Sequence, residues 1–185
     1  MAQLNNPIPF TKLAVGAGAG ILVAAIFCAN LLFSRDDVTH LDAQAMSLVT
    51  SHGAFKTVRG DGLREIHVFL SADCSFCRKI EPELDRLENV TVYRHMLPGH
   101  TEAGRLVAVE IWCAKDQAQA WKAVAAGQQI SPAKCDGSVI DKNLALASKL
   151  GLTMTPSIVY GDGQVSAGML SVSEISARIA ISDKG

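Results

Sequence analysis

The pattern of apolar and polar positions predicts alternating strands and helices from residue 54 onward. Short apolar or alternating runs, which are typical of strands, occupy residues 54–59, 66–70, 90–97, 157–160 and 164–167. Apolar residues recur three or four positions apart, as on one face of a helix, in residues 75–87, 101–127, 141–150 and 171–181. These elements predict an α/β domain over residues 54–185, in which helices flank a central sheet.

A long uncharged segment precedes this domain. Residues 13–33 carry no charge, and a helix of that length, rising about 1.5 Å per residue, matches a hydrocarbon core of about 30 Å. Lys12 flanks one end, whereas Arg35 at the other end is followed by two aspartates. The positive-inside rule therefore favours a cytoplasmic lead over residues 1–12 and an exported domain. We expect residues 13–33 to be an uncleaved transmembrane anchor.

The alternative for this segment is a cleaved signal peptide. Val23-Ala24-Ala25 provides the small residues that a cleavage site needs. The apolar run nevertheless continues from Ile26 to Phe33, and a cleaved protein would expose it. Continuity of the apolar run favours the anchor.

Residues 34–53 are expected to form a tether between the anchor and the domain. Apolar residues in the tether are spaced as on one side of a short amphipathic helix: Leu41, Ala45, Leu48 and Val49. The predicted helix ends near Gly53.

Composition narrows the classes of function. The chain has 185 residues, a formal net charge of -1 and 19% charged residues, so nothing indicates a nucleic-acid-binding protein. Five cysteines are present. Cys28 lies in the apolar segment, which leaves four that can be grouped as two pairs. An even set of cysteines in a small domain is typical of an oxidising compartment.

The strongest chemical motif is Cys74-Ser75-Phe76-Cys77. It follows an apolar strand and begins a helix, so the helix N-terminus faces the first sulfur. The unpaired N–H groups and positive end of a helix stabilise a thiolate and lower its pKa from about 8.5. We expect Cys74 to be the exposed attacking thiol and Cys77, one turn further on, the resolving thiol in thiol–disulfide exchange. The intervening Ser75 and Phe76 are expected to tune the redox equilibrium.

Metal binding is the alternative chemistry, because half of a zinc site has the same C-x-x-C spacing. Cys113 and Cys135 stand alone rather than as a second C-x-x-C, which argues against a zinc site. Downstream, Thr155-Pro156 precedes a strand, as a cis proline beside a dithiol does. A proline opposite the sulfurs would exclude a bridging metal and leave the Thr155 backbone free to pair with an extended substrate. We therefore predict redox chemistry without a metal or cofactor.

Four segments carry a resemblance to a known family: residues 74–77, 111–116, 131–136 and 150–156. In this order and at these separations they resemble the catalytic thioredoxin-fold domain of bacterial periplasmic disulfide isomerases of the DsbC and DsbG type. The resemblance covers residues 54–180.

This resemblance implies a thioredoxin fold with a mixed central sheet and a helical insertion. It also implies that Cys113 and Cys135 form a permanent structural disulfide, which we expect to be buried beside Trp112, and that the peptide bond before Pro156 is cis. The implied activity is that of a disulfide isomerase or reductase acting on protein substrates with non-native disulfides. A DsbD-like membrane reductant would supply electrons, and the domain would face the periplasm from the bacterial inner membrane.

The chain departs from the family ahead of the domain. Family isomerases carry an N-terminal dimerisation domain, for which residues 34–53 leave too little room. A homodimer would then form through the membrane helix or the tether. Without the enclosed cleft of the family dimer, a net dithiol oxidase is an alternative to an isomerase. A non-catalytic scaffold of an envelope secretion or conjugation assembly and a metal carrier are alternatives from other classes.

Overall fold

A mixed five-stranded sheet forms the centre of the described chain, which is residues 40–182 of a computed structural model. The strands are β1 (Phe55–Arg59), β2 (Arg64–Ser71), β3 (Val90–Leu97), β4 (Ser157–Tyr160) and β5 (Val165–Ala167). They lie in the order β1-β3-β2-β4-β5. Strands β2 and β3 are parallel, whereas the pairs β1 with β3, β2 with β4 and β4 with β5 are antiparallel.

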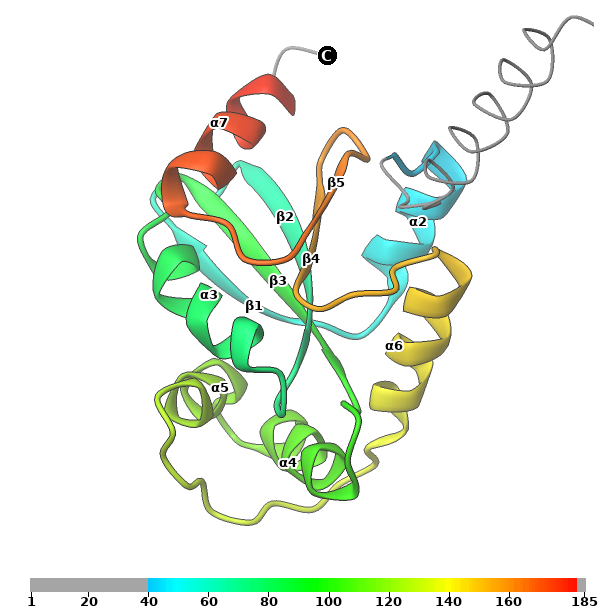
Figure 1. Ribbon diagram of the computed structural model, residues 1–185, viewed down its shortest axis with the longest axis vertical. Coiled ribbons are helices and arrows are strands. Elements are labelled where there is room, and N and C mark those ends of the chain that lie inside the picture. The colour runs from blue at the N-terminus through cyan, green and yellow to red at the C-terminus, as the bar shows by residue number, and fades with distance from the viewer. Residues whose placement is uncertain (1–39, 183–185) are drawn as a thin grey trace, which may run out of the picture. The chain divides into compact units, whose positions relative to one another are not determined.

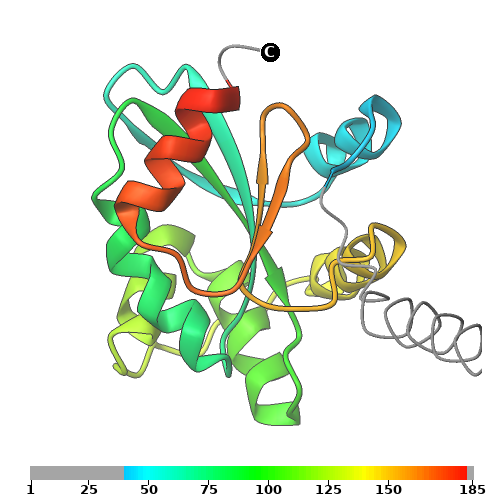
Figure 2. The same ribbon diagram turned by 45° about the horizontal axis from the view of Figure 1, so that its top comes forward.

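Helices cover both faces of the sheet. They are α2 (Ala43–Ser51), α3 (Ser75–Asp85), α4 (Glu102–Cys113), α5 (Gln117–Ala125), α6 (Ser138–Lys149) and α7 (Val172–Ser182). Helices α3, α5 and α7 lie on one side of the sheet, and α2 and α6 lie on the other (Figure 1, Figure 2). Helix α3 connects the two parallel strands, as a parallel connection requires.

Two apolar cores follow from this layering, because successive side chains of a strand point to opposite faces. Val68 and Leu70 of β2 pack into the larger core, which holds apolar residues of α3, α4, α5 and α7. Phe69 between them packs into the second core with residues of α6 and Val49 of α2. The sequence therefore encodes a three-layer α/β/α domain, as its apolar pattern predicted.

The predicted strands are all present, but two helical predictions need correction. The helical region predicted over residues 101–127 is two helices, α4 and α5. Residue Ala114 is extended, and the Asp116 carboxylate then caps α5 by accepting the Gln119 N–H at 3.0 Å. The helix predicted from residue 141 begins earlier, at Ser138. The first difference arises from a polar capping residue, Asp116, which apolar periodicity does not report. Helix α6 has Gly137 as its N-cap, and the Ser138 N–H at its start donates to the Asp136 carboxylate at 2.9 Å.

Helix α2 packs against the domain. Leu41 and Val49 are buried in the second core. The Leu41 N–H donates to the carbonyl of Gly163 at 2.7 Å, and His40 forms a β-bridge with Gln164. Residues from His40 onward therefore belong to the same compact unit as the sheet, whereas the sequence pattern placed them in a tether.

The predicted anchor over residues 13–33, with Cys28, lies outside the described residues. Within residues 40–182, none of the helices combines the length and the apolar character that crossing a membrane requires.

Candidate active site

The cysteine motif lies where β2 ends and α3 begins. Cys74 is the N-cap residue of α3, and its sulfur accepts a hydrogen bond from the Cys77 N–H at 3.3 Å. Cys74 is half-buried, whereas Cys77 is completely buried in the larger core. Ser75 and Phe76, between them, are exposed, and Phe76 retains 54% of its accessible surface. The apolar spacing grouped Phe76 with Ile80 and Leu84, but Cys77 takes its place on the buried face of α3.

The pKa of Cys74 is lower than that of an ordinary thiol. Burial raises it, but hydrogen bonds from the Thr155 side chain, from Cys77 and from the backbone N–H of Phe76 lower it further than burial raises it. These donors stabilise the thiolate, because a hydrogen bond to the charged form favours ionisation. Cys74 is therefore partly exposed and more readily ionised than an ordinary thiol.

The pKa of Cys77 is displaced in the opposite direction, to about 12. Burial is the main cause, and the hydrogen bond and negative charge of Cys74 raise it further. The two sulfurs of the motif are thus chemically distinct, because Cys74 loses its proton more readily than an ordinary thiol and Cys77 less readily.

The loop before β4 lies against the motif. The Thr155–Pro156 peptide bond is cis, and the Cys74 thiol lies 3.4 Å from the Thr155 carbonyl oxygen, to which it donates. The pairing of β4 with β2 starts at Ser157, opposite Phe69, which fixes the loop beside the end of β2. The fold therefore brings together Cys74, Cys77, Thr155 and Pro156, as the sequence predicted.

Asp73, immediately before the motif, is a site residue that the sequence reasoning missed. Its Oδ2 accepts hydrogen bonds from the His100 N–H at 2.8 Å and from the Thr101 N–H and hydroxyl at 3.1 and 3.2 Å. A Cβ on Gly99 would lie 2.2 Å from Asp73 Oδ1, and one on Gly104 would lie 2.6 Å from Oδ2. Burial raises the pKa of Asp73, but these hydrogen bonds lower it below its usual value. The carboxylate thereby connects the active-site turn to the start of α4. Gly99 and Gly104 leave the space that this carboxylate occupies, and they are the sequence feature that could have indicated it.

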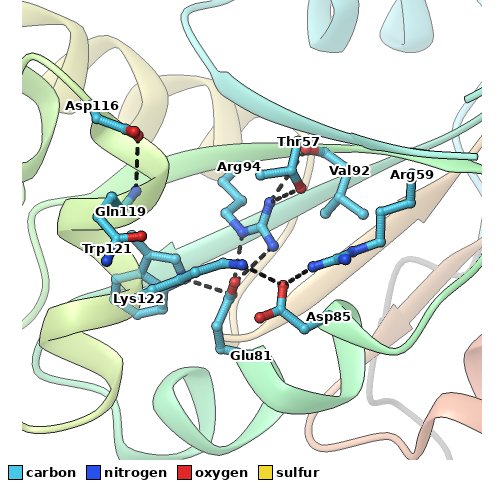
Figure 3. A network of polar contacts seen from close by, with 10 residues as sticks. All are labelled: Thr57, Arg59, Glu81, Asp85, Val92, Arg94, Asp116, Gln119, Trp121 and Lys122. Carbon is cyan, nitrogen blue, oxygen red and sulfur yellow. Dashed lines mark hydrogen bonds and ion pairs between the residues drawn. The ribbon is translucent and has the colours of Figure 1, made fainter.

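A buried ion pair holds α3 in place (Figure 3). Arg94 of β3 donates to both carboxylate oxygens of Glu81, at 2.7 and 3.2 Å, and both side chains are almost fully buried. The Trp121 indole N–H donates to the same carboxylate at 2.6 Å, and Arg94 also donates to Thr57 at 2.9 Å. One turn after Cys77, the active-site helix is therefore fixed to β3 and to α5.

Cys113 and Cys135 are bonded to each other. The bond joins the end of α4 to the loop before α6 and spans 22 positions of the sequence. Cys135 is exposed and Cys113 half-buried, so the expectation of a buried bridge is wrong. The reason is that the loop around residues 131–136 is polar and runs over the surface. Cys74 and Cys77 are the free cysteines within residues 40–182.

Comparison with curated proteins points to one group. A protein of Bordetella pertussis named probable thiol:disulfide interchange protein DsbC is 34% identical over 152 residues, which are 79% of this chain and 54% of that protein. The Escherichia coli K12 thiol:disulfide interchange protein DsbC is 32% identical over 107 residues, 56% of this chain and 45% of that protein. The chain thus spans about half the length of the curated relatives it matches.

Solved structures show the same fold. A disulfide interchange protein from Neisseria gonorrhoeae superimposes with a TM-score of 0.64 at 28% identity, over 70% of this chain and 94% of that one. Proteus mirabilis ScsC in a compact conformation superimposes with a TM-score of 0.60 at 17% identity, over 88% of this chain and 90% of that one. A family model described as a thioredoxin-like domain matches residues 52–180. With its cysteine motif at the start of α3 and a match over most of its length, the chain belongs to the thioredoxin-like domain family.

Proposed function

We propose that this protein is a thiol:disulfide oxidoreductase of the DsbC type, acting on disulfides of other proteins. The observation that carries the proposal is the contrast between the two sulfurs of the motif. Cys74 is accessible and has a lowered pKa, whereas Cys77 is buried and has a pKa of about 12. Such a pair suits a nucleophile that attacks from the surface and a second thiol that acts later.

The first step is attack by the Cys74 thiolate on one sulfur of a substrate disulfide. The substrate S–S bond breaks, a mixed disulfide between Cys74 and the substrate forms, and the other substrate sulfur leaves as a thiolate. Thr155 would orient the substrate; its position beside Cys74 and just outside the β2–β4 ladder supports this role. Its backbone would pair with an extended segment of substrate, as in strand addition.

Two routes complete the reaction. A second substrate thiolate attacks the mixed disulfide, which regenerates reduced Cys74 and leaves the substrate with a rearranged disulfide. Alternatively, Cys77 attacks Cys74, so that the substrate leaves reduced by two electrons and the Cys74–Cys77 disulfide remains. Burial keeps Cys77 protonated, which slows the second route and gives the substrate time for the first. This asymmetry supports isomerisation over net reduction of the substrate.

The remaining parts of the proposal concern location and partners. An oxidising compartment suits a domain that carries the Cys113–Cys135 disulfide, and for a DsbC-type protein that compartment is the periplasm. Residues 13–33 would anchor the domain to the inner membrane. A DsbD-like membrane reductant would return Cys74 and Cys77 to the dithiol after reductive turnover, and a homodimer would form through the residues ahead of the domain.

A mixed-disulfide trap tests the proposal. In the Cys77→Ala variant the mixed disulfide lacks its internal resolving thiol, so covalent complexes with substrate proteins should accumulate and disappear on addition of dithiothreitol. The Cys74→Ser variant is the matched control and should capture nothing. Refolding of scrambled ribonuclease by the wild-type protein measures isomerisation, and turbidity of insulin measures reduction. Absence of all three activities would exclude the function.

The direction of the reaction in the cell is tested by the redox state of Cys74. Alkylation of acid-quenched cells should find Cys74 and Cys77 reduced for an isomerase. A fully oxidised pair would identify a net dithiol oxidase instead.

A further inference from the structure

A groove beside Cys74 has the chemistry of a binding site for part of the substrate. It has a volume of about 510 Å³ and is bounded by the active-site turn, the β3–α4 loop, α6 and residues 152–155. We infer that this groove, called the Cys74 groove below, binds an apolar side chain next to the cysteine of the substrate. The inference rests on the proposed function and names the class of substrate segment that it prefers.

The wall formed by α6 and the loop before β4 is apolar. Leu97 and Ala147 are buried, whereas Leu144 and Met154 line the groove and retain 44% and 50% of their accessible surface. Within residues 40–182, other side chains cover Leu144 and Met154 only in part, so both remain in contact with water. Exposed apolar side chains that line one groove are a feature of binding sites for other molecules.

The charges around the groove argue against an acidic occupant. Among the described residues that line the groove, Asp73 is the one with a permanently charged side chain. Its Oδ2 already accepts three hydrogen bonds at the start of α4. Lysine and arginine are absent from the described lining. A carboxylate in the groove would therefore lose water without gaining a cation, whereas an apolar side chain would bury surface against Leu144 and Met154.

A second hollow, on the other side of Asp73, provides a contrast. It has a volume of about 550 Å³, and Arg78 and Glu110 line it together with Asp73. Val107, Val124 and Ile130 also line it, but Cys74 and Thr155 do not. Of these two hollows, the Cys74 groove is therefore the one that a peptide bonded to Cys74 adjoins.

Continuity with the reacting sulfur identifies the occupant. Cys74 and Thr155 both line the groove, so a peptide held by a disulfide to Cys74 and by the backbone of Thr155 already lies at its mouth. An extended peptide advances about 3.3 Å per residue, and alternate side chains point to the same side. A residue one or two positions from the substrate cysteine therefore reaches the groove.

Synthetic peptides provide the test. Each peptide carries one cysteine as a mixed disulfide with glutathione in a glycine and serine background, and a single leucine, serine or aspartate stands at position −2, −1, +1 or +2. The rate of reaction with the reduced full-length protein is measured by quenching and mass spectrometry. At one position leucine should react about tenfold faster than serine, as expected for burying one side chain, and aspartate should react more slowly than serine.

A positive charge introduced at Leu144 tests whether the apolar wall of the groove causes this preference. The Leu144→Lys variant should react more slowly with the leucine peptide and faster with the aspartate peptide, so that the preference inverts. The control is Leu106→Lys on α4, where Leu106 is 57% exposed and does not line the groove, and it should keep the wild-type preference. Circular dichroism confirms that each variant is folded, and Met154→Lys replaces Leu144→Lys if that variant is not.

The outcomes separate the two proposals. Equal rates for leucine, serine and aspartate at every position in the wild-type protein would overturn the groove inference and leave the oxidoreductase function intact. An unchanged preference in both groove variants would also overturn it. Failure of the wild-type protein to react with any of the disulfides would overturn the proposed function itself.

Discussion

At the scale of single residues, position rather than chemistry separates Cys74 from Cys77. Both are thiols three residues apart, but one caps a helix at the surface and the other points into the core. Donors at the helix start stabilise a thiolate on Cys74, while burial opposes a charge on Cys77. The C-x-x-C spacing predicted that Cys77 is the more buried of the two, because position one turn along a helix determines which way each side chain points.

Alkylation should reveal the two thiols separately. In the reduced protein, iodoacetamide should modify Cys74 with a half-maximal rate at a pH below about 8.5, the ordinary thiol pKa. Cys77 should remain unmodified until the protein is unfolded, since its pKa is about 12 and it is buried. Mass spectrometry across a pH series measures both. Equal labelling of the two cysteines in the folded protein would contradict the assignment.

A second pair of titratable residues lies inside the sheet. His67 Nδ1 and His95 Nε2 are 3.0 Å apart, and Tyr93 and Phe69 stack on the two rings. Burial lowers the pKa of His67 to about 4 despite the nearby Glu65. Burial, together with the charges of His67 and His52, lowers that of His95 to about 3. Both imidazoles are therefore neutral in the folded protein near neutral pH.

Acid should destabilise the fold through this pair. Between pH 6.5 and 4 the unfolded chain binds protons that the folded His67 does not, so stability is complete above pH 6.5 and falls as the pH decreases. For His67 the loss by pH 4 is on the order of 3 kcal/mol. Urea unfolding at a series of pH values measures it. The His67→Phe variant should show a shallower pH dependence, and His100→Gln, at an exposed histidine, should match the wild type.

At the scale of elements, the buried ion pair decides where α3 lies. Helix α3 carries Cys77 and Glu81 on the same face, and Glu81 bonds to Arg94 of β3 and Trp121 of α5 (Figure 3). A charge buried in a core needs a partner with good geometry, and the bidentate contact provides it. The alternation of β3 places Arg94 on the same side as Val92 and Met96. The alternation of β3 therefore predicts that Arg94 is buried. It does not predict that Glu81 is its partner.

Removing one partner of this pair should be costly. Glu81→Gln leaves the Arg94 charge buried without a counter-charge and should lower the free energy of unfolding by about 3–5 kcal/mol. The double variant Glu81→Met, Arg94→Met should lose less than Glu81→Gln, because no charge then remains buried. Urea denaturation measures both variants. Glu88→Gln, at an exposed position shortly after α3, is the control and should change stability by less than about 0.5 kcal/mol.

The disulfide acts on a different element, the loop between α5 and α6. Replacing both Cys113 and Cys135 with serine releases a loop with a sequence separation of 22, which should cost about 3 kcal/mol of stability. Alkylation of Cys74 should keep its pH profile, because neither residue contacts the motif. A shifted Cys74 profile in the double variant would show that the disulfide also supports the active site.

At the scale of the whole molecule, the domain begins earlier than the sequence pattern indicated. The strands, the cysteine motif and the proline loop were predictable, since each has a local signal in apolar alternation, spacing or proline. The packing of α2 against the domain was not predictable, because the spacing of Leu41 and Val49 is equally consistent with a short amphipathic helix in a tether. Their burial depends on Phe69, Val159 and Leu146, which are distant in the sequence.

Truncation tests this boundary. A chain that starts at His40 should unfold cooperatively with the stability of the full domain. A chain that starts at Ala54 exposes the surface that Leu41 and Val49 cover, and should lose several kcal/mol, since burying one such side chain contributes about 1.5–3 kcal/mol. Thermal unfolding of the two chains measures the difference. Equal unfolding temperatures for the two chains would show that α2 does not stabilise the domain and is a tether.

The two tryptophans of the chain, Trp112 and Trp121, both lie in the helical insertion. Trp121 is completely buried and bonded to Glu81, and Trp112 precedes the disulfide cysteine at the end of α4. Intrinsic fluorescence of this protein therefore reports the environment of α4 and α5 and does not sample the sheet directly. An emission change without a matching change in far-ultraviolet circular dichroism would signal that the insertion has left α3 while the sheet stays intact.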